Sequence, residues 1–221
     1  RWGVTGGVIE SGAGSSEIVV KWDAVTVSTA RRIVVEAAAP GACTATTELT
    51  VMVQPNPALT INGPNKVCGD SLATYTVVDF NNTGSSLSWT VEGGEIESGQ
   101  FTSVVVVRWD SVGSTATRLL RVHAGTSFGC TATKELSVDI VPNPILTITG
   151  NTSMCSDSTA MYKALDEAAA ATAYAWSVDG GVILSGQGSN TIEVRWNSVG
   201  SPVERIISLR AESGAGCVAV T

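Results

Sequence analysis

The sequence predicts an all-β protein made of tandem copies of one β-sandwich module. The first observation is a repeat with a period of 87 residues, held without insertion or deletion. The second is a series of short segments rich in Val, Ile and Thr, separated by Gly, Ser, Asn and Asp, which is typical of strands joined by turns. Two tryptophan positions recur with the period: Trp2, Trp89 and Trp176, and Trp22, Trp109 and Trp196. A spacing this regular indicates a tandem array of one folding unit.

Two Pro-Asn-Pro triplets, Pro55 to Pro57 and Pro142 to Pro144, mark the boundaries between repeats. Proline disfavours helix and central strand, so each triplet predicts a stiff, extended joint. We therefore expect an incomplete repeat over 1–54, without its first two strands, and a complete repeat over 58–141. The last repeat, 145–221, is expected to lack its final strand. On this interpretation the chain is an excerpt from a longer array, or neighbouring molecules complete its ends.

The complete repeat contains seven segments with strand character. They lie at 59–61, 73–78, 87–91, around Ile96, and at 104–109, 118–124 and 135–141. Alternation predicts that Leu120, Val122 and Ala124 face the interior, because successive side chains of a strand point to opposite faces. The segment 166–171 replaces 79–84 of the preceding repeat at equal length and is read as a variable loop. About seven short strands with frequent turns indicate immunoglobulin-like sandwiches.

Composition and charge narrow the function. Only 15% of the residues are charged, which with abundant Val and Ile argues against disorder. The net charge of -7 is spread along the chain, so no nucleic-acid partner is expected. No apolar run approaches the ~20 residues of a membrane-spanning helix. Residue 1 already lies inside a repeat, so the sequence contains no signal peptide, and the compartment must be inferred from other features.

The complete repeat resembles the PKD-like, immunoglobulin-like repeats of large surface proteins of Bacteroidota. The resemblance rests on Tyr75, on Ser-Trp-Thr-Val-x-Gly-Gly at 88–94, on Val-Arg-Trp at 107–109 and on Gly-Cys-Thr-Ala-Thr at 129–133. It implies a β-sandwich, export by the type IX route, and a role as spacer, stalk or adhesin. The family's Asp-rich Gly-Asp-Gly turn is replaced by Gly93 and Gly94, so the resemblance implies no metal site here.

Five cysteines in a repeat array suggest an oxidising compartment. Three pairings are open. Bonds within repeats would join Cys68 to Cys130 and Cys155 to Cys217, and bonds across a linker would join Cys43 to Cys68 and Cys130 to Cys155. The third pairing, Cys68 with Cys217, follows from topology. The turn after the first strand lies at the exit end of a repeat, and the turn before the last strand lies at the entrance end of the next.

The candidate chemistry is sparse, and neither a catalytic residue, nor a cofactor, nor a metal is expected. His123 is the single histidine, it points outward, and its counterparts are Glu36 and Arg210. A Ser-His-Asp triad or a histidine metal cluster within this chain is therefore not expected. The tryptophans share strand faces with Val, Ile and Leu, which makes four of them the core signature of the repeats: Trp89, Trp109, Trp176 and Trp196.

Three short Asp-Ser-x motifs predict candidate O-glycosylation sites at Ser71, Ser158 and Ser111. Ser71 and Ser158 hold equivalent places beside a cysteine, and the motif looks like the glycosylation sites of exported Bacteroidota proteins. The simpler interpretation is a polar turn, since Asp and Ser favour turns.

The preferred hypothesis is a non-catalytic structural or adhesive repeat array of a secreted or cell-surface protein, acting as a stiff spacer or filament. Its expected partners are neighbouring repeats or identical chains, and surface glycans or other cells. A carbohydrate-binding accessory module of a secreted enzyme is the alternative, for which an exposed aromatic platform would be required.

Overall fold

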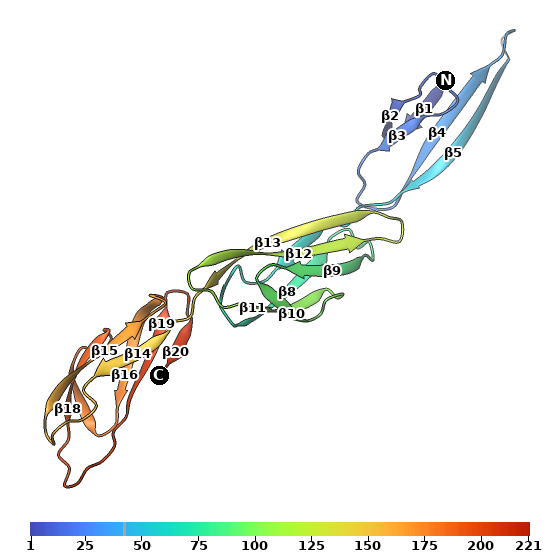
Figure 1. The fold of residues 1–221 in the computed structure, drawn as a ribbon. Helices are drawn as coiled ribbons and strands as arrows, with labels where there is room; N and C mark the ends of the chain where they lie inside the picture. The colour runs from blue at the N-terminus through green and yellow to red at the C-terminus, as the bar shows by residue number, and fades with distance from the viewer. Residues whose placement is uncertain (42) are drawn as a thin grey trace.

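The protein is described by a computed structural model covering residues 1–41 and 43–221. The described residues form strands and no helix, which confirms the predicted all-β fold. Figure 1 shows a first, a middle and a last unit following one another along the chain, joined at the two Pro-Asn-Pro segments.

The middle unit is a two-layer β-sandwich of two four-stranded sheets. The first sheet has the order β10-β11-β8-β6 and comprises Gly94–Ser98, Val104–Trp109, Leu72–Asp79 and Leu59–Asn62. The second has the order β7-β13-β12-β9 and comprises Lys66–Cys68, Thr131–Val141, Ala116–Gly125 and Ser86–Val91. The strands predicted from the sequence all appear at their expected places, within a few residues at the ends.

The core of the middle unit lies between these sheets. Leu120, Val122 and Ala124 are fully buried, as the alternation of β12 predicts. Trp109 packs edge-on against Tyr75 with ring centroids 6.2 Å apart, and its Nε1 donates to the Tyr75 hydroxyl at 3.1 Å. Aromatic pairs of this geometry add to the stability gained by burial. The second tryptophan, Trp89, donates from Nε1 to the carbonyl of Thr102 at 2.9 Å.

The last unit repeats the arrangement with fewer residues. One sheet has the order β14-β15-β18-β17, comprising Leu146–Gly150, Thr159–Asp166, Thr191–Trp196 and Gly181–Ser185. The other has the order β16-β19-β20, comprising Ala171–Val178, Ile207–Ser213 and Val218–Val220. The aromatic pair recurs, since Trp196 donates to the Tyr162 hydroxyl at 3.1 Å.

The first unit has one three-stranded sheet and one hairpin. The sheet β1-β4-β5 comprises Trp2–Thr5, Thr29–Ala38 and Thr44–Val53, and the hairpin β2-β3 comprises Gly7–Ser11 and Val19–Trp22. Trp2 and Trp22 are only partly buried here, whereas their counterparts Trp89 and Trp109 are buried. The difference follows from the strands present, because nothing in this unit corresponds to β6 and β8 of the middle unit.

Two sequence predictions need correction. Cys68 does not lie in a turn after the first strand, because the chain forms a further strand, β7, which crosses to the other sheet and pairs in parallel with the end of β13. The last repeat does not end before its final strand, since Val218–Val220 forms β20 and pairs with β19. Three residues give too little alternation to reveal either strand in the sequence.

Candidate functional site

The feature that combines most of the predicted residues is the joint between the middle and last units. We use "the joint" for residues 141–145, the turn Cys68 to Ser71 and the turn Ser213 to Cys217. Pro142 and Pro144 of its linker are buried, and Asn143 between them is half-buried. Proline fixes φ and lacks a backbone donor, so these two residues restrict the linker before any tertiary contact forms.

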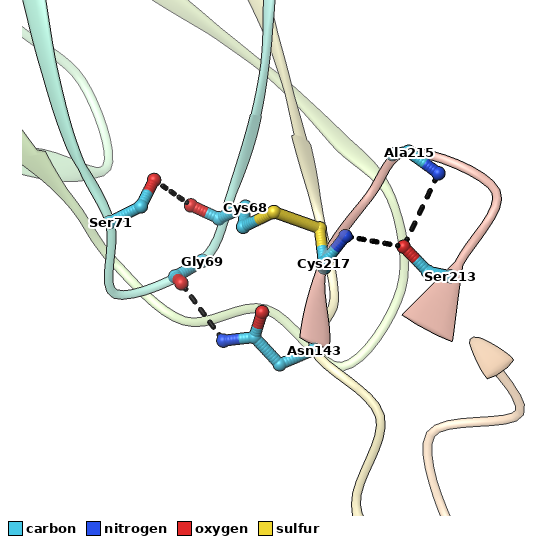
Figure 2. Close-up of a disulfide and its surroundings, with 7 residues drawn as sticks. All are labelled: Cys68, Gly69, Ser71, Asn143, Ser213, Ala215 and Cys217. Carbon is cyan, nitrogen blue, oxygen red and sulfur yellow. Dashed lines mark hydrogen bonds between the residues drawn. A yellow bond between two sulfur atoms is a disulfide. The ribbon is translucent and has the colours of Figure 1, made fainter. Parts of the chain in front are cut away.

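A disulfide crosses the joint. Cys68 and Cys217 are bonded, with Cα atoms 5.6 Å apart and 149 residues of sequence separation between them (Figure 2). This is the pairing expected from topology, because the exit end of one repeat faces the entrance end of the next. The pairings within repeats and across the linker are not formed. Of the cysteines that the structure describes, the unbonded ones are Cys43, Cys130 and Cys155.

Hydrogen bonds support the disulfide on the side of the middle unit. Strand β7 pairs with β13 from Asp139 to Val141, and the Gly69 amide then donates to the Val141 carbonyl at 2.9 Å. The Asn143 side chain donates from Nδ2 to the Gly69 carbonyl at 2.9 Å (Figure 2). The linker is therefore bonded to the same turn that carries the disulfide.

The two turns that present the cysteines are shaped by short polar side chains. Asp70 adopts a left-handed conformation with φ 55°, which Asp tolerates better than most residues. The Ser71 hydroxyl donates to the Cys68 carbonyl at 2.6 Å. On the opposite side, Ser213 is buried, and its hydroxyl accepts from the Cys217 amide at 3.1 Å. Both cysteines are thus held by local structure independent of the disulfide.

An aspartate at the end of β8, and its counterpart at the end of β15, binds the linker that precedes each of these sandwiches. Asp79 accepts from the Ala58 amide at 2.8 Å and from the Thr83 amide at 3.0 Å. Asp166 makes the equivalent bond to the Ile145 amide at 2.8 Å. The loops that begin at these aspartates have different sequences, so the predicted variable loop contains a constant anchoring residue. The signal that would have revealed it is the recurrence of Asp at an 87-residue interval.

The hydrogen bonds to these aspartates outweigh the effect of their burial. Burial acts to raise the pKa of the Asp79 carboxyl, but bonds from Thr83, Ala58 and Asn81 together hold the pKa below its ordinary value of 3.8. The pKa of Asp166 is also lowered. Burial acts to raise it, and hydrogen bonds from four backbone amides outweigh that effect: those of Ala171, Ile145, Ala170 and Ala168. Both carboxylates are therefore charged near neutral pH, which maintains the anchors.

The joint between the first and middle units is less restrained. Pro55 and Pro57 are buried, and the Asn81 side chain donates to the Asn56 carbonyl at 2.9 Å. Among the described residues, however, no disulfide links these two units, and Cys130 is unbonded. The disulfide found among the described residues therefore crosslinks the joint between the middle and last units.

The remaining predicted residues are dispersed. Four tryptophans are at most 9% exposed and lie in the sandwich cores: Trp89, Trp109, Trp176 and Trp196. His123 is exposed, and its Nδ1 lies 3.1 Å from the Thr133 hydroxyl oxygen. Among the described residues, no group of three or more His, Cys, Asp or Glu side chains gathers as a metal site.

The three candidate glycosylation sites differ in their surroundings. The hydroxyls of Ser71 and Ser158 donate to the carbonyls of Cys68 and Cys155, at 2.6 Å and 2.5 Å. Ser111 is exposed. A glycan on Ser71 or Ser158 would have to replace a hydrogen bond of the turn, so the polar-turn role has structural support while modification stays a prediction.

Comparison with known families identifies the module. The sequence model of the PKD-like domain family matches residues 54–138 and 141–221. These two matches cover more than half of the chain, so the chain belongs to the PKD-like domain family. The two matched segments meet within residues 138–141, immediately before the Pro-Asn-Pro linker of the joint.

Comparison with solved structures finds distant similarity, with TM-scores below 0.5. The human desmocollin-1 ectodomain is 16% identical with a TM-score of 0.33, over 100% of this chain and 50% of that one. Protocadherin gamma B2 domains 3–6 are 11% identical with a TM-score of 0.36, over 100% and 66%. The Yersinia pseudotuberculosis adhesin InvE is 17% identical with a TM-score of 0.30, over 75% and 59%. The chain thus spans about half to two thirds of these structures. Comparison with curated protein sequences finds no significant match.

No helix in the described part of the chain is long and apolar enough to cross a membrane.

Proposed function

We propose that this chain is a stiff, extended, non-catalytic segment of a secreted or cell-surface protein, serving as a spacer or filament in adhesion. The observation that carries the proposal is the joint, where a disulfide joins two consecutive sandwiches whose linker is already restricted by two buried prolines. A flexible multi-domain protein needs neither device. Both devices suit a spacer, because the distance it spans depends on the angle at each joint.

The compartment follows from the same bond. Structural disulfides form and persist in oxidising environments such as the cell exterior, and are rare in the cytosol. The proposed location is therefore extracellular, with type IX export as the proposed route on the strength of the family resemblance. The proposed partners are neighbouring repeats, identical chains, and glycans or proteins of other surfaces. The carbohydrate-binding alternative lacks support in the two matched repeats, because their tryptophans are buried.

The shape of the chain in solution tests the spacer role. Strand β13 has 11 residues, so a sandwich is about 37 Å long at about 3.4 Å per residue, and three in a row span about 110 Å. Small-angle X-ray scattering is expected to give a radius of gyration near 30 Å, as for a rod of that length. A value near 17 Å, which a compact globule of this size would show, would rule the proposal out.

Exposure of the native protein tests the location. Proteolytic shaving of intact source cells, followed by mass spectrometry, is expected to release peptides of these repeats. Recovery of the repeats only after cell lysis would contradict the surface assignment while leaving the spacer geometry standing.

A further inference from the structure

We propose that the Cys68–Cys217 disulfide is a tension bypass, which keeps the middle and last sandwiches folded when the chain is pulled from its ends. The inference rests on the proposed spacer role, since a spacer between two surfaces is pulled lengthwise. It concerns the path that force takes through the covalent structure, which the disulfide changes.

Without the disulfide, tension would run through the whole middle unit, entering at the start of β6 and leaving at the end of β13. Among the described residues, the segment β6–β7 is hydrogen-bonded to β13 through the parallel pairing of β7 with β13. This pairing joins Lys66–Cys68 to Asp139–Val141. Pulling from the two ends would slide these strands in opposite directions. Such a short ladder offers few hydrogen bonds against that shear.

With the disulfide, the shortest covalent path from Arg1 to Thr221 runs along the chain to Cys68, across the sulfur–sulfur bond, and on from Cys217. The segment 69–216 lies off this path. It contains β8–β13 of the middle unit and β14–β19 of the last unit, together with the four buried tryptophans. Tension through the backbone therefore bypasses the core of the last unit and reaches the core of the middle unit only along β6 and β7, at Leu59, Ile61 and Val67.

The geometry of the joint makes the bypass short. The Cα atoms of Cys68 and Cys217 are 5.6 Å apart, although 149 residues of sequence separate them. Those residues would extend to about 540 Å if pulled straight, at up to about 3.6 Å per residue. The disulfide removes nearly all of that length from the covalent path that bears the force. On the path between the Pro-Asn-Pro linker and Cys68, only the few residues of β6 and β7 remain to be stretched.

The first unit provides an internal comparison. No disulfide encloses it among the described residues, and its tryptophans are only partly buried. It lies on the tension path whether or not the disulfide is intact. We expect it to unfold in every state of the chain, releasing at most about 190 Å at about 3.6 Å per residue over 1–53.

Single-molecule force spectroscopy on the full 221-residue chain tests the bypass, with handles fused to both ends. Cys43, Cys130 and Cys155 are replaced by Ser so that one disulfide alone can form, and peptide mapping verifies it. In the oxidised chain we expect the extension of the first unit and at most the few residues of β6 and β7. After reduction to two thiols by a phosphine, which becomes the phosphine oxide, we expect roughly 500 Å of further extension, from the length that the disulfide had removed from the path.

A matched variant removes the bond without a reductant. Cys68→Ser with Cys217→Ser, in the same background, is expected to give the long extension under oxidising conditions and no response to the phosphine. Circular dichroism checks that this variant is folded. Full extension in a chain with a verified disulfide would overturn the proposal, as would mapping that finds Cys68 and Cys217 unbonded. Neither result would alter the scattering test of the spacer role, so the bypass proposal and the spacer proposal can fail separately.

Discussion

At the residue scale, the repeats depend on a pair of buried aromatic groups that recurs with the period. Trp109 donates to Tyr75 and Trp196 donates to Tyr162, each at 3.1 Å. A buried donor left without a partner costs about 1–3 kcal/mol, more than an ordinary intramolecular hydrogen bond contributes. The tyrosine hydroxyl is therefore as much a part of the core as the rings.

Replacing Tyr75 by Phe is expected to lower the free energy of unfolding by about 1–3 kcal/mol, because the buried Nε1 of Trp109 loses its acceptor. Urea denaturation measures the change. Tyr174→Phe is the matched control, since Tyr174 is half-buried and no hydrogen bond of its hydroxyl is found among the described residues. Equal effects of the two substitutions would show that the Trp109 bond has no special weight.

The same residue predicts a loss of stability in alkali. Burial raises the pKa of Tyr75 to about 12, and the bond from Trp109 offsets only part of that effect. The unfolded chain loses this proton near the ordinary value of 10.0, so the folded state becomes less favourable as pH rises from there to about 12. Denaturation curves across that range check the trend, and ultraviolet titration should show an ionisation near pH 12 that Tyr75→Phe removes. A titration above pH 10 that Tyr75→Phe leaves unchanged would contradict it.

At the scale of elements, a strand can be predicted where inward-facing and outward-facing residues alternate over enough positions to define a pattern. β11 and β12 alternate over six or more residues and lie where the sequence placed them. β7 and β20 have three residues each, and what defines them is pairing with a distant strand. The sequence leaves three possible disulfide partners for Cys68, namely Cys43, Cys130 and Cys217. The pairing depends on how two sandwiches meet, and no single segment of the sequence determines that contact.

Asp79 carries the prediction at this scale, because it anchors the loop between β8 and β9 to the linker. Asp79→Asn is expected to weaken the bonds to the Ala58 and Thr83 amides and to cost about 1–1.5 kcal/mol, the difference between hydrogen bonds to a charged and to a neutral acceptor. Hydrogen exchange should speed up at these amides, while exchange at the equivalent amides around Asp166 stays unchanged.

The anchors also predict acid sensitivity. The pKa of Asp79 is lowered in the folded state, so its contribution to stability is present above the ordinary value of 3.8 and is lost as pH falls through the lowered value. Exchange at Ala58 should therefore accelerate in the wild type below pH 3.8 and be insensitive to pH in that range in Asp79→Asn after correction for intrinsic rates. Equal acid sensitivity in both proteins would exclude this role.

At the scale of the whole molecule, the proposed stiffness of the chain depends on how consecutive sandwiches are joined. The period predicted the modules and the Pro-Asn-Pro segments predicted the joints. The disulfide adds a covalent constraint between two units. The sequence predicts that Cys68 and Cys217 lie at facing ends of consecutive units, but it does not determine which cysteine bonds to Cys68. Among the described residues, the joint between the middle and last units is crosslinked, and the joint between the first and middle units is restrained by prolines and an aspartate anchor.

Removing the crosslink should loosen the pair of sandwiches. Cys68→Ser with Cys217→Ser is expected to lower the stability of the middle and last units by about 2–4 kcal/mol, the usual contribution of a native disulfide. Thermal unfolding should show the change, and a reductant should have no effect on the variant. Cys130→Ser with Cys155→Ser is the control, because both thiols are unbonded, and its unfolding should match the wild type.

The most direct test of a crosslinked joint is peptide mapping of the chain under non-reducing conditions. The account predicts one disulfide-linked pair of peptides, containing Cys68 and Cys217, with Cys43, Cys130 and Cys155 recovered as thiols. A linked pair containing Cys68 and Cys130 would place the bond inside one sandwich. That result would remove the covalent restraint from the joint and contradict the account.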